Sequence, residues 1–322
     1  MLCMKNMICI LGILLIHVTT IAQVNKLIIG RTTGIFQVEN KESVRVFGFT
    51  NTLSGQVTLP GTTIEVMEGD NVTLDFWNIS QGDPHEIFIK GIQLKKKDSS
   101  PIKNADNSVH HMEHGYYSFI AKQPGTYVYY CPVNYPFNIQ AGMFGVLVIR
   151  GHEDHLSSTS KELNQKELLW CSFEMDPKWH ENSLMDVEYG QQLELSELPP
   201  YKPQHFFING KTNEQLNNKE MVVNLDTEQA TVLRLVNTGF WKHKIKFPKE
   251  LKVEVKRGNA LKHNKLSSLN QLTIKPLETF ELWITCEKKT NMNIQFDFIN
   301  PETNSIENTQ YIPVKIKNNH IN

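Results

Sequence analysis

The chain has almost no net charge, and it shows little sign of the common catalytic motifs. Its 33 lysines and arginines balance 34 aspartates and glutamates, which leaves a formal net charge of −1. Without an excess of positive charge there is no electrostatic basis for binding nucleic acid or an anionic membrane surface. The sequence also lacks a phosphate-binding glycine loop, a Ser-His-Asp order and a convincing pair of carboxylates. It therefore does not indicate the common nucleotide-binding or hydrolase classes.

Long apolar runs are also missing, except for a segment at the N-terminus that has the features of an export signal. Lys5 precedes an apolar stretch over residues 7–16, and small residues before Gln23 suit signal peptidase. The stretch is shorter than the roughly 20 residues that span a membrane. We predict a signal peptide over residues 1–22, no membrane span after its cleavage, and export to the periplasm or out of the cell. The alternative interpretation is an N-terminal membrane anchor.

Cysteine is scarce and its count is odd. Cys3 and Cys9 fall in the predicted signal peptide, which leaves Cys131, Cys171 and Cys286. An odd number in an exported protein leaves at least one thiol unpaired, and such a thiol survives oxidation when it is buried or bound to metal. Cys171 and Cys286 either form a disulfide or are two small buried residues, and we favour burial.

Helical periodicity is scarce as well, and short alternating runs dominate instead. In the first half these runs cover residues 44–49, 63–66, 72–77 and 145–150. In the second half they cover residues 167–173, 204–208, 231–236, 251–255, 271–274, 280–285, 294–298 and 311–316. Alternating runs separated by Gly, Asn, Asp and Pro turns are typical of β-sandwiches. We predict an all-β chain with domains over residues 23–151 and 165–322, joined by a polar linker over residues 152–164.

The most specific local pattern is GTYVYYCPVNYPFNIQAGMFG, residues 125–145. A strand-like run ends at Cys131, a loop follows, and Met143 comes twelve residues after the cysteine. His85 ends an earlier strand-like run that begins near Trp77. A blue copper site needs a thiolate on a rigid strand end, a weak thioether from the next loop and a histidine from another strand. The pattern therefore predicts a copper site.

These features resemble the multicopper oxidase and copper nitrite reductase superfamily, and the resemblance covers most of the mature chain. In the first domain it rests on Phe47-Gly48-Phe49, on Asp83-Pro84-His85 and on the loop from Cys131 to Met143. In the second domain, residues 174–180, 207–211 and 233–239 match more weakly. The resemblance implies two tandem cupredoxin-like Greek-key β-sandwiches with copper as the cofactor.

The resemblance assigns three of the four type 1 copper ligands to His85, Cys131 and Met143. Asn138 stands where the second histidine is expected, five residues before Met143. Three ligands suit copper, Cu(I) above all, because Cu(I) tolerates low coordination and favours sulfur; a water or the Asn138 oxygen would fill the remaining position. The alternative is a decayed site in which Cys131 and Met143 are core residues. That alternative explains less well why position 85 is a histidine.

The histidines that bind the oxygen-reducing coppers in the family are absent here. Their positions hold Phe88, Lys90, Tyr130 and Pro132. In the second domain only His243 remains, and Lys246 and Pro248 occupy neighbouring ligand positions. Because oxygen reduction needs several imidazoles at one place, we do not expect reduction of oxygen or nitrite by this chain alone.

A histidine-rich segment offers a further candidate metal site. His110, His111 and His114 lie within five residues, together with Met112. Such a tract can bind Cu or Zn, and one imidazole would replace the missing ligand if the loop folded over the end of the sandwich. The alternative is a polar surface loop.

Three functions are consistent with these observations. The first is a protein that binds a single copper for electron transfer or copper handling, with a redox protein as partner. The second is a copper-dependent oxidoreductase of multicopper oxidase type, completed in a homo-oligomer; this is the class that the resemblance implies if the chain is an enzyme. The third is a metal-free binding or assembly module of the cell envelope. Metal stoichiometry separates the third from the others, and turnover of an oxidisable dye separates the second from the first.

Overall fold

The structure, a computed structural model, describes residues 22–38, 42–82, 84–98, 107–152, 167–186, 196, 198–219, 221–226, 230–259, 269–286 and 291–317. The predicted signal peptide, apart from Ala22, and the predicted linker, apart from His152, lie outside these residues. In the described part of the chain, no helix has both the length and the apolar character that crossing a membrane requires.

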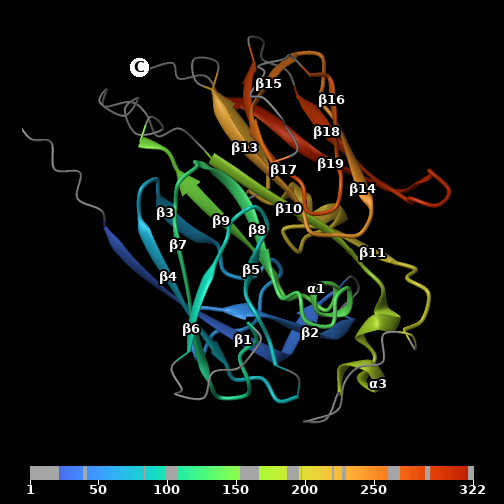
Figure 1. Cartoon of the computed structure of the whole chain (residues 1–322). Coiled ribbons are helices and arrows are strands. Elements are labelled where there is room, and N and C mark those ends of the chain that lie inside the picture. Colours follow the sequence, from blue (N-terminus) through green and yellow to red (C-terminus); the bar gives the residue numbers. More distant parts are fainter. Residues whose placement is uncertain are drawn as a thin grey trace, which may run out of the picture.

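The first half of the chain folds into two packed β-sheets (Figure 1). Its strands are β1 (Gln23–Gln37), β2 (Ser43–Thr50), β3 (Ile64–Met67), β4 (Asn71–Asn78), β5 (Phe88–Ile89), β6 (Lys95–Asp98), β7 (His114–Ile120), β8 (Gly125–Tyr130) and β9 (Phe144–Arg150). One sheet has the order β2-β1-β4-β7-β6 and the other has the order β3-β9-β8-β5. The short helix α1 (Phe137–Gln140) lies between β8 and β9.

Alternation along β4 shows why the sequence forms this sandwich. Val72, Leu74 and Phe76 are fully buried, while the residues between them are only half-buried. Successive side chains of a strand point to opposite faces, so one face of β4 supplies the core. The long strand β1 escaped the sequence analysis because three consecutive residues, Ile28 to Gly30, are buried and a bulge between Arg31 and Gly34 interrupts the alternation.

The second half repeats the same topology. Its strands are β10 (Glu167–Met175), β11 (His205–Ile208), β12 (Val223–Asp226), β13 (Thr231–Asn237), β14 (Lys242–Lys246), β15 (Leu251–Gly258), β16 (Gln271–Ile274), β17 (Thr279–Cys286), β18 (Met292–Ile299) and β19 (Ile306–Lys317). The sheet orders β11-β10-β13-β17-β15 and β12-β19-β18-β14-β16 reproduce those of the first half, with β16 added at one edge. The parallel pair β10 and β13 corresponds to β1 and β4. The fold is therefore all-β, with two tandem cupredoxin-like Greek-key sandwiches, as predicted.

Short helical turns complete the second half. They are the 3-10 helices η3 (Pro177–His180) and η5 (Asn213–Asn217) and the α-helix α3 (Asn182–Met185). Cys131, Cys171 and Cys286 are all buried, and none of them forms a disulfide. The disulfide alternative for Cys171 and Cys286 was therefore wrong, and burial is confirmed.

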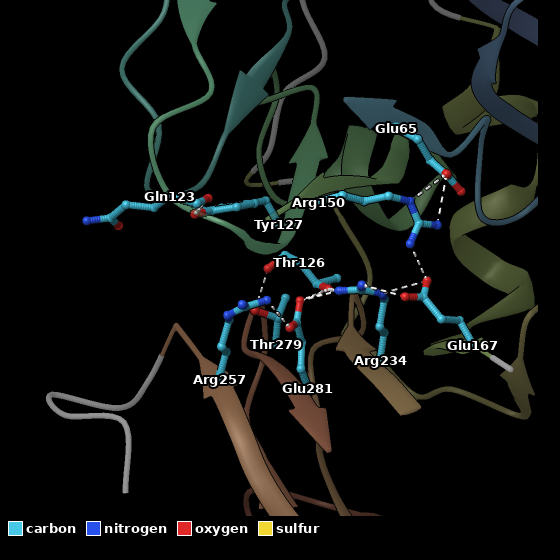
Figure 2. A network of polar contacts seen from close by, with 10 residues as sticks. All are labelled: Glu65, Gln123, Thr126, Tyr127, Arg150, Glu167, Arg234, Arg257, Thr279 and Glu281. Carbon is cyan, nitrogen blue, oxygen red and sulfur yellow. Dashed lines mark hydrogen bonds and ion pairs between the residues drawn. The ribbon is translucent and has the colours of Figure 1, made fainter. Parts of the chain in front are cut away.

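A network of ion pairs joins the two sandwiches (Figure 2). Arg150 of β9 binds Glu65 of β3 at 2.9 Å and Glu167 of β10 at 2.7 Å. Glu167 also binds Arg234 of β13 at 3.1 Å, and Arg234 pairs in turn with Glu281 of β17. Arg234 and Glu281 are 3% and 2% exposed. A pair this deeply buried is costly to break from one side, because the remaining charge loses its partner.

Hydrogen bonds from the first sandwich tie the network to its strand β8. The Thr126 hydroxyl donates to Glu281 Oε1 at 2.9 Å and accepts from Arg234 Nη1 at 3.0 Å. The Thr279 hydroxyl donates to the Thr126 carbonyl at 2.7 Å, and Arg257 binds the second Glu281 oxygen at 3.1 Å. Because these partners come from both halves, the network fixes how the two sandwiches pack together.

Candidate metal centre

Cys131 and Met143 are held at one end of the first sandwich by the antiparallel pair β8 and β9. Tyr130 and Phe144 are paired across the two strands, so the residues that follow and precede them are neighbours as well. The Cys131 N–H donates to the Met143 carbonyl at 3.0 Å. The connecting loop contains α1, which carries Asn138. Two rigid strand ends therefore position the thiol and the thioether-bearing residue, and a short helix adds the amide.

His85 joins this group from the segment that precedes β5. Its Nδ1 lies 3.6 Å from Cys131 Sγ and 3.4 Å from Asn138 Nδ2. Asn138 Nδ2 is also 3.6 Å from Cys131 Sγ. His85 and Asn138 are 1% exposed, and Cys131 and Met143 are 0% exposed. The structure thus brings His85, Cys131 and Asn138 within 3.6 Å of one another, and Met143 lies in the same core cluster as Cys131.

The spacing of these donors fits a bound metal ion. A nitrogen and a sulfur bound to one ion at about 2.0 and 2.3 Å, with a tetrahedral angle, lie about 3.5 Å apart. The separation of His85 Nδ1 and Cys131 Sγ is 3.6 Å. His85 Nε2 is buried and has no hydrogen-bond partner among the described residues. Buried polar groups are normally hydrogen-bonded, and the hydrogen-bond contacts of this imidazole are those of Nδ1 with Cys131 and Asn138.

Burial sets the protonation of the two donors before a metal binds. Burial raises the pKa of the Cys131 thiol to about 11, although hydrogen bonds from the Glu86 and Val133 backbones and from Asn138 oppose the rise. Burial lowers the pKa of His85 to about 4. At neutral pH the imidazole is therefore uncharged and has a free lone pair, whereas the thiol must release its proton to bind a cation.

The second domain covers this end of the first sandwich, which the sequence analysis did not predict. We call residues 176–186 the cover segment; it contains η3 and α3 (Figure 1). η3 packs against β2, and the Trp179 ring lies 6.4 Å from the Phe137 ring of α1. The His180 Nδ1–H donates to the Arg45 carbonyl at 2.7 Å. Trp179 and Met185 of this segment belong to the core of the first domain.

The histidine-rich segment is placed near the site through its backbone and not through its imidazoles. Val109 pairs with His85 in a β-bridge, but His111 Nδ1 donates to the Ser80 carbonyl at 2.6 Å. His114 Nδ1 donates to Asp75 at 2.6 Å, and its ring is stacked on Trp77. His110 is half-buried. Over the described ranges, no three His, Cys, Asp or Glu side chains are grouped to hold a metal ion.

Aromatic rings occupy two of the positions at which the sequence analysis expected ligands of the oxygen-reducing coppers. Phe88 of β5 pairs with Tyr130 of β8, and their rings contact at 5.3 Å between centroids. Phe88 is 38% exposed. Because a phenyl ring has no donor atom and a phenol is a poor ligand at neutral pH, this pair does not replace imidazole ligands.

In the second domain, His243 of β14 takes part in a closed hydrogen-bond network. Its Nδ1 is 2.8 Å from Ser172 Oγ, and its Nε2 is 3.1 Å from Glu174 Oε2. The other Glu174 oxygen accepts from the backbone N–H groups of Phe240 and Trp241. With both ring nitrogens already bonded to protein, His243 is structural. The sequence analysis missed Ser172 and Glu174, which come from a different strand, β10.

Comparison with known proteins identifies relatives of this fold. Residues 39–154 match the family model for multicopper oxidase, whereas no curated protein sequence matches the chain significantly. A multicopper oxidase crystal structure is similar with a TM-score of 0.66 at 14% identity, over 91% of this chain and 88% of the other. The blue copper oxidase from Nitrosomonas europaea has a TM-score of 0.66 at 16% identity, over 91% and 86% of the two chains.

A copper nitrite reductase from Nitrosomonas europaea is similar as well. Its TM-score is 0.64 at 14% identity, and the match covers 92% of this chain and 95% of the other. At such identities the likeness concerns the fold. The chain thus has the two-domain cupredoxin fold of multicopper oxidases and copper nitrite reductases, and its first domain matches the multicopper oxidase family model.

Proposed function

We propose that this protein is an exported cupredoxin that binds one copper ion in its first domain, for electron transfer or copper handling and not for oxygen reduction. The observation that carries the proposal is the buried approach of His85 Nδ1 to Cys131 Sγ, at 3.6 Å. The fold comparison supports it, because the similar proteins include oxidases and reductases named for copper.

Each residue has a distinct part in this function. His85 offers an imidazole nitrogen that burial keeps uncharged, and Cys131 offers a sulfur that becomes a thiolate when its proton leaves. Met143, the residue before β9, offers a thioether, and strands β8 and β9 hold the two sulfur-bearing residues in place. Copper, when bound, would supply one-electron redox chemistry.

A matched pair of cysteine variants tests the proposal. The mature protein is loaded with copper, dialysed and analysed for metal, alongside Cys131→Ser and Cys171→Ser. Both cysteines are unpaired and fully buried, so they differ chiefly in their neighbours. We expect stoichiometric copper in the parent protein and in Cys171→Ser, and its loss in Cys131→Ser. Equal copper content in all three proteins would contradict the proposal, and absence of copper from all three would favour the metal-free module.

Oxidation of a phenolic dye under oxygen tests the second part of the proposal. The aromatic pair of Phe88 and Tyr130 leaves that position without imidazole donors, so we expect no copper-dependent turnover. Copper-dependent oxidation by an oligomer of this chain would instead support the oxidoreductase whose sites are completed between subunits.

A further inference from the structure

We propose that the first-domain site selects cuprous over cupric ion, with Asn138 as the residue that determines this specificity and the cover segment as the closure of the site. This inference rests on the proposed copper binding. The residues of the site would favour one oxidation state of copper. A protein that favours Cu(I) in this way would hold copper and would not exchange electrons rapidly.

The donor set is the first argument. His85 Nδ1 and Cys131 Sγ lie 3.6 Å apart. Met143, whose carbonyl accepts from the Cys131 N–H, would add a second sulfur, and such a set is soft and suits Cu(I). Cu(II) prefers more nitrogen or oxygen donors in a tetragonal arrangement. The fourth position presents the amide of Asn138, whose nitrogen lies 3.4 Å from His85 Nδ1. An amide nitrogen is not a ligand at neutral pH, and rotation of the amide would offer only a weak carbonyl oxygen.

Charge in a dry site is the second argument. A thiolate with Cu(I) has no net charge, whereas a thiolate with Cu(II) has a charge of plus one. The site is at most 1% exposed, and among the residues around it are the rings of Phe47 and Phe137. Burial in apolar surroundings disfavours a net charge. The surroundings of Cys131 therefore favour the cuprous state.

Hydrogen bonds to the sulfur are the third argument. The Glu86 N–H lies 3.5 Å from Cys131 Sγ, and Asn138 Nδ2 lies 3.6 Å from it. Donors aimed at a thiolate withdraw electron density from it, so the thiolate stabilises a higher positive charge on the metal less well. Asn138 thus has two effects. It stands where the resemblance would place an imidazole ligand, and its amide N–H group donates a hydrogen bond to the Cys131 sulfur.

The cover segment closes the site to further ligands. A cavity of about 20 Å³ adjoins His85 and Asn138, and Met185 of the cover segment lines it together with Phe47 and Phe137. Such a volume holds about one water molecule. Met185 therefore narrows the path by which water and external ligands reach the site, which slows both the oxidation of the ion and its release.

Affinities for both oxidation states test the specificity. Cu(I) affinity is measured by anaerobic competition with a coloured cuprous chelator, and Cu(II) affinity by competition with a cupric chelator, with EPR after exposure to air. We expect the parent protein to hold EPR-silent copper and to show no intense thiolate band with Cu(II). We expect Asn138→His to gain the band and to bind Cu(II) at least about 100-fold more tightly, since even residues that only hydrogen-bond to a metal's ligands are worth ~10–100-fold in affinity.

The matched control is Gln140→His, which adds an imidazole on the same helix on the side near Tyr201. We expect no band and no gain in Cu(II) affinity from it. A parent protein that binds Cu(II) at Cys131 with an intense band would overturn this inference and leave the proposed copper binding intact. A parent protein that binds neither ion would overturn both. The parent measurement decides the matter even if a variant does not fold.

The rate of copper release tests the closure. Met185 and Met221 are both 2% exposed, but Met221 lies in the core of the second domain. We expect Met185→Ala to transfer copper to an external chelator about tenfold faster or more, because local opening becomes easier. We expect Met221→Ala to match the parent rate. Equal rates in the two variants would overturn the closure.

Discussion

His85 and His243 are buried histidines in the two domains, and their surroundings differ in kind. His85 has an unpartnered Nε2, and its Nδ1 makes only long contacts, at 3.4 and 3.6 Å. His243 has both nitrogens engaged, at 2.8 and 3.1 Å. Burial is nearly the same in the two cases. The two histidines therefore differ in the hydrogen bonds of their ring nitrogens and not in their burial.

The two domains also differ at the position that follows the corresponding strand. In the second domain the residue after β18 is Asn300, where the first domain has Cys131 after β8. A carboxylate, Glu174, lies opposite the remaining imidazole and also accepts two backbone N–H groups. The polar groups around His243 thus satisfy one another, while His85 Nε2 in the first domain has no partner among the described residues.

The largest expected effect comes from breaking the network in the second domain. Glu174→Leu leaves His243 and two backbone N–H groups without their acceptor in a fully buried place. We expect the free energy of unfolding to fall by roughly 3–5 kcal/mol, measured by urea denaturation. A loss below about 1 kcal/mol, the size of one ordinary hydrogen bond, would show that the network is not what holds His243.

A variant of the interdomain network measures how much the ion pairs between the two sandwiches contribute to stability. Arg234→Met leaves Glu281 buried with Arg257 as its remaining cation. We expect a loss of about 3 kcal/mol in the free energy of unfolding, at the low end for a broken buried pair. Arg150→Met is the control: this side chain is 26% exposed, so its loss should cost about 1 kcal/mol or less. Equal costs for the two variants would contradict the role of burial.

The cover segment predicts a dependence of stability on pH. Burial lowers the pKa of His180 from 6.5 to about 4, although the Arg45 carbonyl and Asp176 oppose this and His205 adds to it. The unfolded chain therefore takes up a proton at higher pH than the folded one. The contribution of His180 is complete above about pH 6.5 and falls as pH drops toward 4, by about 1.4 kcal/mol per pH unit.

Urea denaturation of the parent protein and His180→Gln between pH 7.5 and about 4 measures this contribution. We expect the stability of the variant to fall less steeply over that range, because it lacks one group that binds a proton only when the chain unfolds. Parallel curves would contradict the burial of an uncharged imidazole in the cover segment.

The smallest expected change in unfolding free energy comes from His85→Leu, which compares the two buried histidines directly. His85→Leu removes an imidazole that has no short hydrogen bond to lose, so the metal-free protein should change in unfolding free energy by less than about 1 kcal/mol. His243→Leu should cost more, since Ser172 and Glu174 lose their partner. Copper binding should show the reverse order, with loss in His85→Leu only. A large stability loss in His85→Leu would place this residue in the same class as His243.

Much of the fold followed from local patterns, because a strand that is buried on one face must alternate. Residues 72–77 and 145–150 were predicted as strands and lie in β4 and β9. The long strand β1 was missed because its bulge and its run of consecutive buried residues remove the alternation. The spacing of Cys131 and Met143 was informative because a hairpin pairs its own two ends, so a short local sequence specifies both positions.

The amino-acid sequence by itself determined the strands and the short-range part of the site, since hydrophobic alternation and a single hairpin are local. Only the tertiary structure decided what each histidine does. His85 meets Cys131 across 46 residues, His243 meets Glu174 across 69, and His180 meets Arg45 across 135. Contacts of such separation leave no local pattern, because they arise when sheets and domains pack and not from the preferences of neighbouring residues.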